Sequence, residues 1–271
     1  MKVRAYGKIN LSLYVTGMRG NLHTLDSVMT TVSVCDELTV VPAPMIGVTC
    51  GLAIPPASNV AYRAARLVEE ACGLKLAVDI KKGIPVGGGL GGSSADGAAV
   101  LYCARELSPA LDVRALSARL GSDVYFMLRG GSCRVTGTGD ELAPIDSSAD
   151  FSALIVDCGS VGTPECYRTF DRIGTPGLNR NDELIAALRS GKKIEDGSIH
   201  NDLAAPARLL NPRIAAAEEI IRAAGSAPHL TGSGGCLFVL DAPAALADKL
   251  ERQGFPCKFV SYAPRGVEIV G

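Results

Sequence analysis

A run of glycines between two apolar segments is the feature that most constrains this chain. Residues 85–99 read PVGGGLGGSSADGAA and carry five glycines in the six positions from 87 to 92. Glycine allows positive φ angles and lets a ligand approach bare N–H groups. A helix that begins directly after the run adds free amides and the positive end of its dipole, a combination that binds phosphate.

We therefore predict a phosphate-binding loop followed by a helix from Ser94 to Leu107. A flexible linker is the plainest alternative, but a linker would not lie between an apolar strand and an alanine-rich helix, and a tight turn needs fewer glycines. The loop lacks the lysine of a P-loop, and the chain lacks the strict βαβ order of a dinucleotide fold. Asp96 is expected to be a cap partner for the helix amides. The residues predicted to bind the nucleotide are Pro85, Gly87, Gly88, Gly89, Leu90, Gly91, Gly92, Ser93 and Ser94.

Composition narrows the class of protein. Of the 271 residues, 47% are hydrophobic and 20% charged, which supports a substantial core in one large or two small domains. The chain has 27 Lys and Arg against 28 Asp and Glu. A net charge near zero argues against nucleic acid or an anionic membrane as a partner, so any bound anion must be held locally.

The cysteines and the apolar segments predict a soluble cytoplasmic protein. Nine cysteines without a CxxC pair indicate reduced thiols. The amino terminus has alternating strand character, and no apolar run reaches the length of a membrane span. His200 and His229 lack the spacing of metal ligands, so no protein metal site is expected.

The order of the expected elements indicates an α+β protein of two domains, residues 1–148 and 149–271. Alternating polarity predicts a strand over 9–15, and a β-branched segment predicts another over 27–41 with a turn at 35–37. Helical spacing of apolar residues predicts a helix over 59–72. Further helices are expected at 114–120, 164–171, 181–190 and 212–224, and further strands at 76–80, 130–136, 151–156, 237–240 and 258–262.

The glycine loop matches the pattern PxGxGLGxSSA of the small-molecule kinases named after galactokinase, homoserine kinase, mevalonate kinase and phosphomevalonate kinase (GHMP). The chain resembles this superfamily in two further stretches, AYGKINLSL at 5–13 and LTGSGGCLF at 230–238. Three motifs in the right order cover nearly the whole chain. The resemblance implies the two-domain GHMP-kinase fold, with an amino-terminal domain like domain 2 of ribosomal protein S5 and a ferredoxin-like carboxy-terminal domain.

Within the superfamily, the chain most resembles the 4-diphosphocytidyl-2-C-methyl-D-erythritol kinases of the non-mevalonate isoprenoid pathway. The form AxxKINLxLxVTGxR from residue 5, His23 with LDSV at 25–28, GSDV at 121–124 and NDL at 201–203 carry this resemblance. It implies an ATP-dependent kinase that phosphorylates the 2-hydroxyl of the cytidylated small molecule. Mg²⁺ is inferred from the reaction, because no metal motif is visible.

Phosphoryl transfer to an alcohol needs positioning, neutralisation of charge on the γ-phosphate, and a group beside the hydroxyl. The resemblance implies that Asp123 faces the hydroxyl and that Lys8 keeps Asp123 ionised and polarises the nucleophile. Without the resemblance, an Asp after Gly-Ser is more often a helix cap, and a lone Lys in a strand is more often solvated.

The resemblance also implies a set of binding residues. Asn59 lies at the head of its helix, where it is either an N-cap or a nucleotide contact. Asn10 follows Lys8 by two positions, so in a strand both side chains share a face. The glycine run 232–235 packs beside the phosphates or the substrate, or else forms a tight turn. The residues expected at the substrate are Asn10, His23, Tyr167, Thr231, Gly232 and Gly234.

Substrate recognition is where the chain departs from the family pattern. The family usually has Asp-Gly-Tyr-His after the arginine that ends the pattern AxxKINLxLxVTGxR, and its tyrosine and histidine hold the cytosine. Here Arg19 is followed by Gly-Asn-Leu-His, with Leu22 in place of the tyrosine. Aromatic stacking contributes about 1–3 kcal/mol per base, so this loss matters. Tyr167 is the candidate second wall, unless it only packs with Phe170.

Two other functions stay open at this point. A different acceptor would make the chain another GHMP-superfamily kinase for an alcohol or a phosphate. A non-catalytic nucleotide-binding protein would keep the fold and the loop without turnover. Retention of both Lys8 and Asp123 favours a catalyst over the second alternative.

Overall fold

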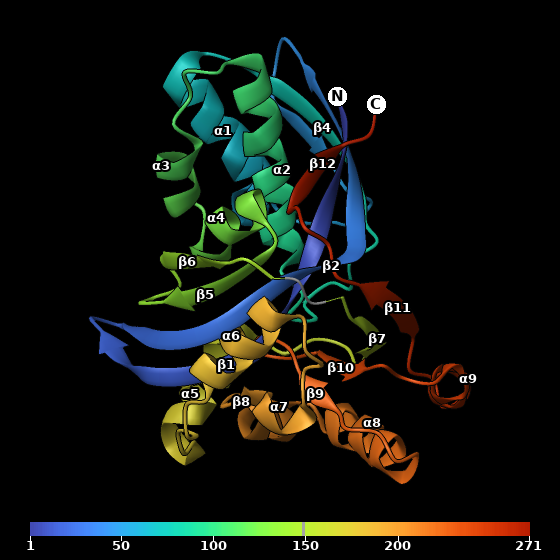
Figure 1. The fold of residues 1–271 in the computed structure, drawn as a ribbon. Helices are drawn as coiled ribbons and strands as arrows, with labels where there is room; N and C mark the ends of the chain where they lie inside the picture. Colours follow the sequence, from blue (N-terminus) through green and yellow to red (C-terminus); the bar gives the residue numbers. More distant parts are fainter. Residues whose placement is uncertain (148–149) are drawn as a thin grey trace.

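The computed structural model describes residues 1–147 and 150–271. Within them, helices and strands of mixed order build the α+β fold that the sequence predicted, with two sheets and helices packed against them (Figure 1). The predicted domain boundary at residue 148 lies outside the described residues. The two chain ends meet, because the N–H of Lys2 donates to the carbonyl of Gly271 at 2.8 Å.

Two long antiparallel strands, β1 (Lys2–Arg19) and β2 (Leu22–Pro42), form the centre of the first sheet. The predicted turn at 35–37 is wrong, because β2 continues through these residues. The pairing register shifts between Tyr6 and Gly7 of β1, opposite residues 32–35 of β2, so the ladder is irregular just before the expected turn. The remaining strands of this sheet are β3 (Gly47–Thr49), β4 (Leu76–Lys81), β5 (Ser132–Thr136), β6 (Glu141–Ile145), β8 (His200–Asn201) and β12 (Val267–Ile269).

Helices α1 to α4 pack on one face of this sheet (Figure 1). Asn59 caps α1, because its side-chain oxygen accepts hydrogen bonds from the N–H groups of Ala61 and Tyr62 at 3.0 and 3.2 Å. The glycine run leads directly into α2, which begins at Gly92, two residues before the predicted start. No side chain of the described residues caps α2, so its first N–H groups stay available to a ligand. The bounds are α1 (Val60–Cys72), α2 (Gly92–Leu107), α3 (Val113–Ala118) and α4 (Ser122–Arg129), with a short 3₁₀ turn η1 (Pro56–Ser58) before α1.

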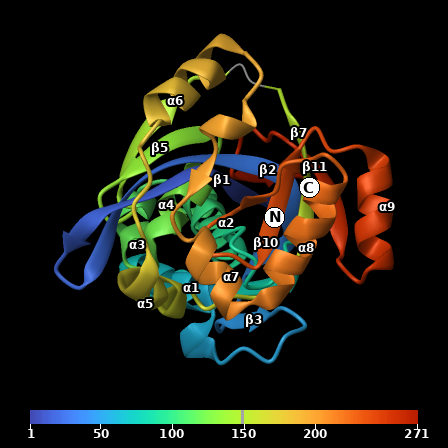
Figure 2. The same cartoon turned by 90° about the horizontal axis from the view of Figure 1, so that it is seen from below.

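The middle of the second sheet is buried on both faces and joins the two hydrophobic cores of the molecule. Along β7 (Ser152–Asp157), Ala153 and Ile155 pack into the first core, whereas Leu154 and Val156 pack into a second core with the carboxy-terminal helices. Figure 2 shows these helices from below. The other elements are α5 (Thr163–Ile173), α6 (Asn181–Ser190), η2 (Asp196–Ser198), α7 (Ala204–Leu210), α8 (Pro212–Ala223), β9 (His229–Leu230), β10 (Cys236–Leu240), α9 (Ala244–Arg252) and β11 (Cys257–Ser261).

All nine cysteines are free thiols in the structure. Among the described residues, none of the helices has both the length and the apolar character that crossing a membrane requires.

Candidate active site

A cleft of about 930 Å³ runs between the glycine loop, β1, the β1–β2 hairpin, α4 and α5. Thr231 and Gly234 are the predicted site residues that do not line it: Thr231 is fully buried, and Gly234 forms a turn by donating its N–H to the Thr231 carbonyl at 3.1 Å. The cleft also contains Ser233, Lys82 and Asp96, which were not predicted for the site. The predicted residues that line it are Lys8, Asn10, His23, Asn59, Pro85, Gly87, Gly88, Gly89, Leu90, Gly91, Gly92, Ser93, Ser94, Asp123, Tyr167 and Gly232.

The glycine loop is held by backbone contacts that only glycine permits. Gly87, Gly89 and Gly91 have φ angles of 70°, 77° and 74°, in the left-handed region. A Cβ on Gly89 would overlap the carbonyl of Thr231 in the second glycine run. The Leu90 carbonyl accepts a hydrogen bond from the N–H of residue 8 in β1 at 2.9 Å. The loop is therefore a fixed cradle rather than a linker.

Lys8 and Asp123 meet beside this cradle. The Nζ of Lys8 lies 3.8 Å from Oδ2 of Asp123, which stands in the first turn of α4. Nζ also donates to Oδ1 of Asn10 at 2.5 Å, as expected for side chains on one face of a strand. Burial lowers the pKa of Lys8, and the negative charge of Asp123 opposes that shift. The pair places a buried ammonium beside a carboxylate that is partly open to the cleft.

The second glycine run is tied to the same strand. The Asn10 side chain accepts from the N–H of Gly232 at 3.0 Å, and the Asn10 N–H donates to Oγ1 of Thr231 at 3.1 Å. Nδ2 of Asn201 donates to the Gly232 carbonyl at 2.9 Å. Thr231 thus supports the site from behind, while Gly232 faces it.

A buried ion cluster holds both ends of the glycine loop. Lys82 precedes the loop and pairs with Asp36 on β2 and, at 2.7 Å, with Asp96 in α2. Asp36 also accepts from the N–H groups of Gly83 and Ile84 at 2.7 and 2.9 Å. The predicted capping role of Asp96 is therefore wrong, because its carboxylate pairs with Lys82 instead of the helix amides. Burial raises the pKa of Asp96 to about 7, although Lys82 opposes the shift.

The far end of the cleft has an aromatic side. The rings of His23 and Tyr167 stack with centroids 4.7 Å apart. Leu22, which replaces the expected tyrosine, is 63% exposed at the rim. Asp171, one helical turn after Tyr167, lies with Oδ1 2.7 Å from Nε2 of His23. The i to i+4 spacing on α5 was the sequence signal that could have placed Asp171 at this site.

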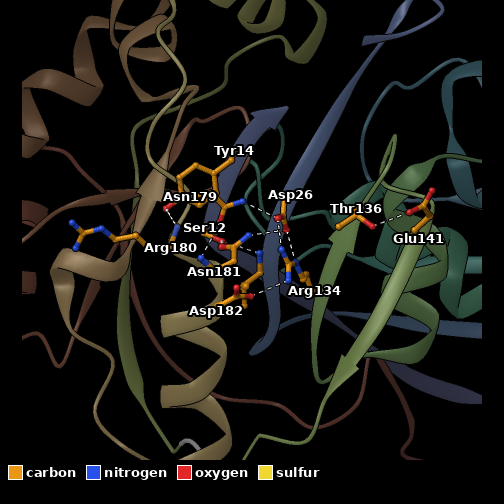
Figure 3. Close-up of polar contacts among 11 residues, drawn as sticks. Ser12, Tyr14, Asp26, Arg134, Thr136, Glu141, Asn179, Arg180, Asn181 and Asp182 are labelled. Atoms are coloured by element: carbon orange, nitrogen blue, oxygen red, sulfur yellow. Dashed lines mark hydrogen bonds and ion pairs between the residues drawn. The ribbon is translucent and has the colours of Figure 1, made fainter. Parts of the chain in front are cut away.

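Asp26 is the hub of a polar network that anchors the segment after α5 (Figure 3). Its carboxylate accepts from Nε and Nη2 of Arg134 on β5 at 2.9 and 2.7 Å, and from Nδ2 of Asn179 and of Asn181 at 2.8 Å each. Burial by itself raises the pKa of Asp26, but these hydrogen bonds outweigh it and lower the pKa below 3.8. The network fixes the chain between α5 and α6 against the hairpin.

We expect Asp26→Asn to reduce the free energy of unfolding by about 2–4 kcal/mol at pH 7, because it removes the charge and replaces one of the two accepting oxygens by an amide donor that faces the same donors. The folded-state pKa is lowered, so this stability is present above the unfolded pKa and is lost as pH falls through the folded value. Urea unfolding at pH 7 and at pH 3 measures the difference.

Asp182→Asn is the matched control for this prediction. Asp182 also pairs with Arg134, at 3.1 Å, but its side chain is 91% exposed. Removing an exposed partner costs about 0.5 kcal/mol or less. Equal losses in the two variants, or a loss at position 26 that does not shrink in acid, would contradict the hub role.

Comparisons with known proteins match both parts of the chain to one group of kinases. Two family models match, the GHMP kinases N terminal domain over residues 59–131 and the GHMP kinases C terminal model over residues 182–257. The chain is 37% identical to a 4-diphosphocytidyl-2-C-methyl-D-erythritol kinase of Mycolicibacterium smegmatis, covering 90% of this chain and 83% of that protein. It is 35% identical to a kinase of the same name from Desulfitobacterium hafniense, covering 91% and 89%.

Solved structures give the same grouping. A crystal structure of 4-(cytidine 5'-diphospho)-2C-methyl-D-erythritol kinase matches with a TM-score of 0.80 at 30% identity, covering 97% of this chain and 99% of that chain. A homoserine kinase from Cytophaga hutchinsonii matches with a TM-score of 0.72 at 16% identity, covering 100% and 97%. The second match shows a shared fold only.

Proposed function

Because this chain belongs to the 4-diphosphocytidyl-2-C-methyl-D-erythritol kinase family of the GHMP kinases, we propose that it transfers the γ-phosphate of ATP to the 2-hydroxyl of that cytidylated alcohol. The product belongs to the non-mevalonate route to isoprenoid precursors. The single observation that carries the proposal is the Lys8–Asp123 pair, which lies in one cleft with the glycine loop and an aromatic base site.

The proposed mechanism gives the glycine loop, Asp123 and Lys8 separate roles. The loop amides and the start of α2 hold the phosphates of ATP. Asp123 orients the substrate hydroxyl and receives its proton, and Lys8 stabilises the negative charge that develops beside it. Burial of Lys8 supports this role, because electrostatic stabilisation is stronger where water is excluded.

Mg²⁺ fits the cleft as a companion of the triphosphate. In the described residues, no group of three or more His, Cys, Asp or Glu side chains is arranged to hold a metal. Mg²⁺ commonly binds through one or two protein oxygens together with substrate phosphates. Ser93, Ser94 and Asp123 line the cleft and offer such oxygens. When bound, the ion would neutralise charge on the transferred phosphoryl group.

The finer assignments belong to the same proposal. Asn59 and the loop bind ATP, while Asn10, His23, Tyr167 and the second glycine run bind the cytidylated alcohol. Residues 1–148 supply the ATP site, and residues 149–271 contribute to the substrate site. We also propose a cytoplasmic location, which the nine free thiols support.

ADP release with MgATP tests the proposal against an acceptor panel of diphosphocytidyl-methylerythritol, mevalonate, phosphomevalonate, homoserine and galactose. We expect turnover with the cytidylated alcohol alone. Turnover with another acceptor would keep the kinase and overturn the substrate. ATP binding without ADP release from any acceptor would favour the non-catalytic alternative.

A further inference from the structure

Asp171 is a carboxylate at the base end of the cleft that the proposed mechanism does not use. It lies on α5 one turn after Tyr167, and its Oδ1 is 2.7 Å from Nε2 of His23. The same imidazole stacks on the ring of Tyr167. Helix α5 therefore contacts the ring face of His23 through Tyr167 and the ring nitrogen Nε2 through Asp171. Only 14% of the His23 side chain stays exposed.

The carboxylate decides where the imidazole carries its proton. An ionised Asp accepts hydrogen bonds and cannot donate, so Nε2 of His23 must be the protonated nitrogen. In a neutral imidazole the other nitrogen, Nδ1, is then an acceptor. Within the described residues, Nδ1 has no hydrogen-bond partner. His23 lines the cleft and its Nε2 is taken by Asp171, so Nδ1 is the ring nitrogen left for a base in the plane of the ring.

We propose that Asp171 sets the base specificity of the substrate site. It does so by fixing His23 in the tautomer whose Nδ1 accepts a hydrogen bond from the 4-amino group of cytosine. The inference rests on the proposed function. Cytosine presents an N–H donor at position 4, where uracil presents a carbonyl oxygen. A lone pair on Nδ1 therefore pairs with the amino group and repels the carbonyl. Asp171 is a positioning residue, since it acts through His23.

The loss of the family tyrosine makes the hydrogen bond between His23 and the base more important here. Stacking attracts every base, so an aromatic wall adds affinity with little choice between pyrimidines. With Leu22 at the rim, the cleft offers Tyr167 as its aromatic wall. Discrimination between cytosine and uracil then depends on the hydrogen bond to His23.

The test compares kcat/KM for the 4-diphosphocytidyl and 4-diphosphouridyl forms of methylerythritol in the wild type and in Asp171→Asn. The asparagine amide keeps the side-chain shape but can donate to Nε2, which turns Nδ1 into a donor that suits uracil. We expect the KM for the cytidine form to rise about tenfold with kcat within about twofold, and the cytidine-to-uridine ratio to fall at least about tenfold.

Two further variants separate this role from a structural one. Glu165→Gln removes the same charge from an exposed position of α5 outside the cleft lining, and we expect both kinetic constants to stay at the wild-type level. In a His23→Ala background, Asp171→Asn should no longer change the ratio. An unchanged ratio in Asp171→Asn, or an equal change without His23, would overturn the proposal. A wild type that is silent with the cytidine form would instead overturn the proposed function beneath it.

Discussion

Asp123→Asn is expected to lower kcat by about 10²–10⁴-fold while the KM for ATP stays within about threefold. The amide keeps the shape of the side chain, but it can neither take a proton nor balance the ammonium of Lys8, whose Nζ lies 3.8 Å from the carboxylate. The side chain of Asp123 is 32% exposed, so the fold tolerates the change. Steady-state ADP release with the cytidylated alcohol and varied ATP measures both constants.

The control for this prediction is Asp248→Asn, which removes an exposed charge from α9 and should leave kcat unchanged. A second readout is the alkaline limb of the pH profile. Burial lowers the pKa of Lys8 and Asp123 opposes that shift. Removal of the carboxylate therefore lowers this pKa further, and activity should be lost at lower pH than in the wild type. Wild-type kcat, or an alkaline limb that does not move, would contradict the assigned pairing.

The parts of the site that could be predicted from the sequence are those with local signals. The glycine run, the helix after it and the N-cap Asn59 depend on neighbours within a few residues, and the structure has all three. The shared face of Lys8 and Asn10 follows from strand alternation alone. Their assignment to chemistry came from the family motifs, since neither residue type at that spacing indicates a kinase.

The parts that escaped prediction depend on distant pairings. Asp36 stands 46 positions before Lys82, and no local pattern links the two. Asp96 follows Ser93 at capping-box spacing, and that local signal gave way to a buried cation brought in by β4. Asp171 reaches His23 across 148 positions. The register shift beside Gly7 likewise depends on the partner strand, so β2 continued through the residues that seemed to form a turn.

Gly89→Ala is expected to reduce kcat/KM for ATP by about 10²-fold, because displacement of a cradle by about 1 Å has an effect of that order. Backbone strain and steric overlap combine at this position. The φ angle of 77° is in the left-handed region, and a Cβ would overlap the Thr231 carbonyl. Backbone cannot rotate aside as a flexible side chain can, so either the loop or the second glycine run must move. Binding of an ATP analogue by calorimetry and steady-state kinetics measure the loss.

Gly73→Ala tests the backbone strain without the steric overlap. Gly73 ends α1 with a φ angle of 74°, and nothing lies within 4 Å of the Cβ it would acquire. That variant should lose about 1 kcal/mol of unfolding free energy and keep wild-type kinetics for ATP. If Gly89→Ala loses no more stability than Gly73→Ala and still binds ATP normally, the close contact between the two glycine runs is not what shapes the phosphate site. A selective loss of ATP binding at position 89 would mean that Thr231, which lies outside the cleft lining, acts on the phosphate site through the glycine loop.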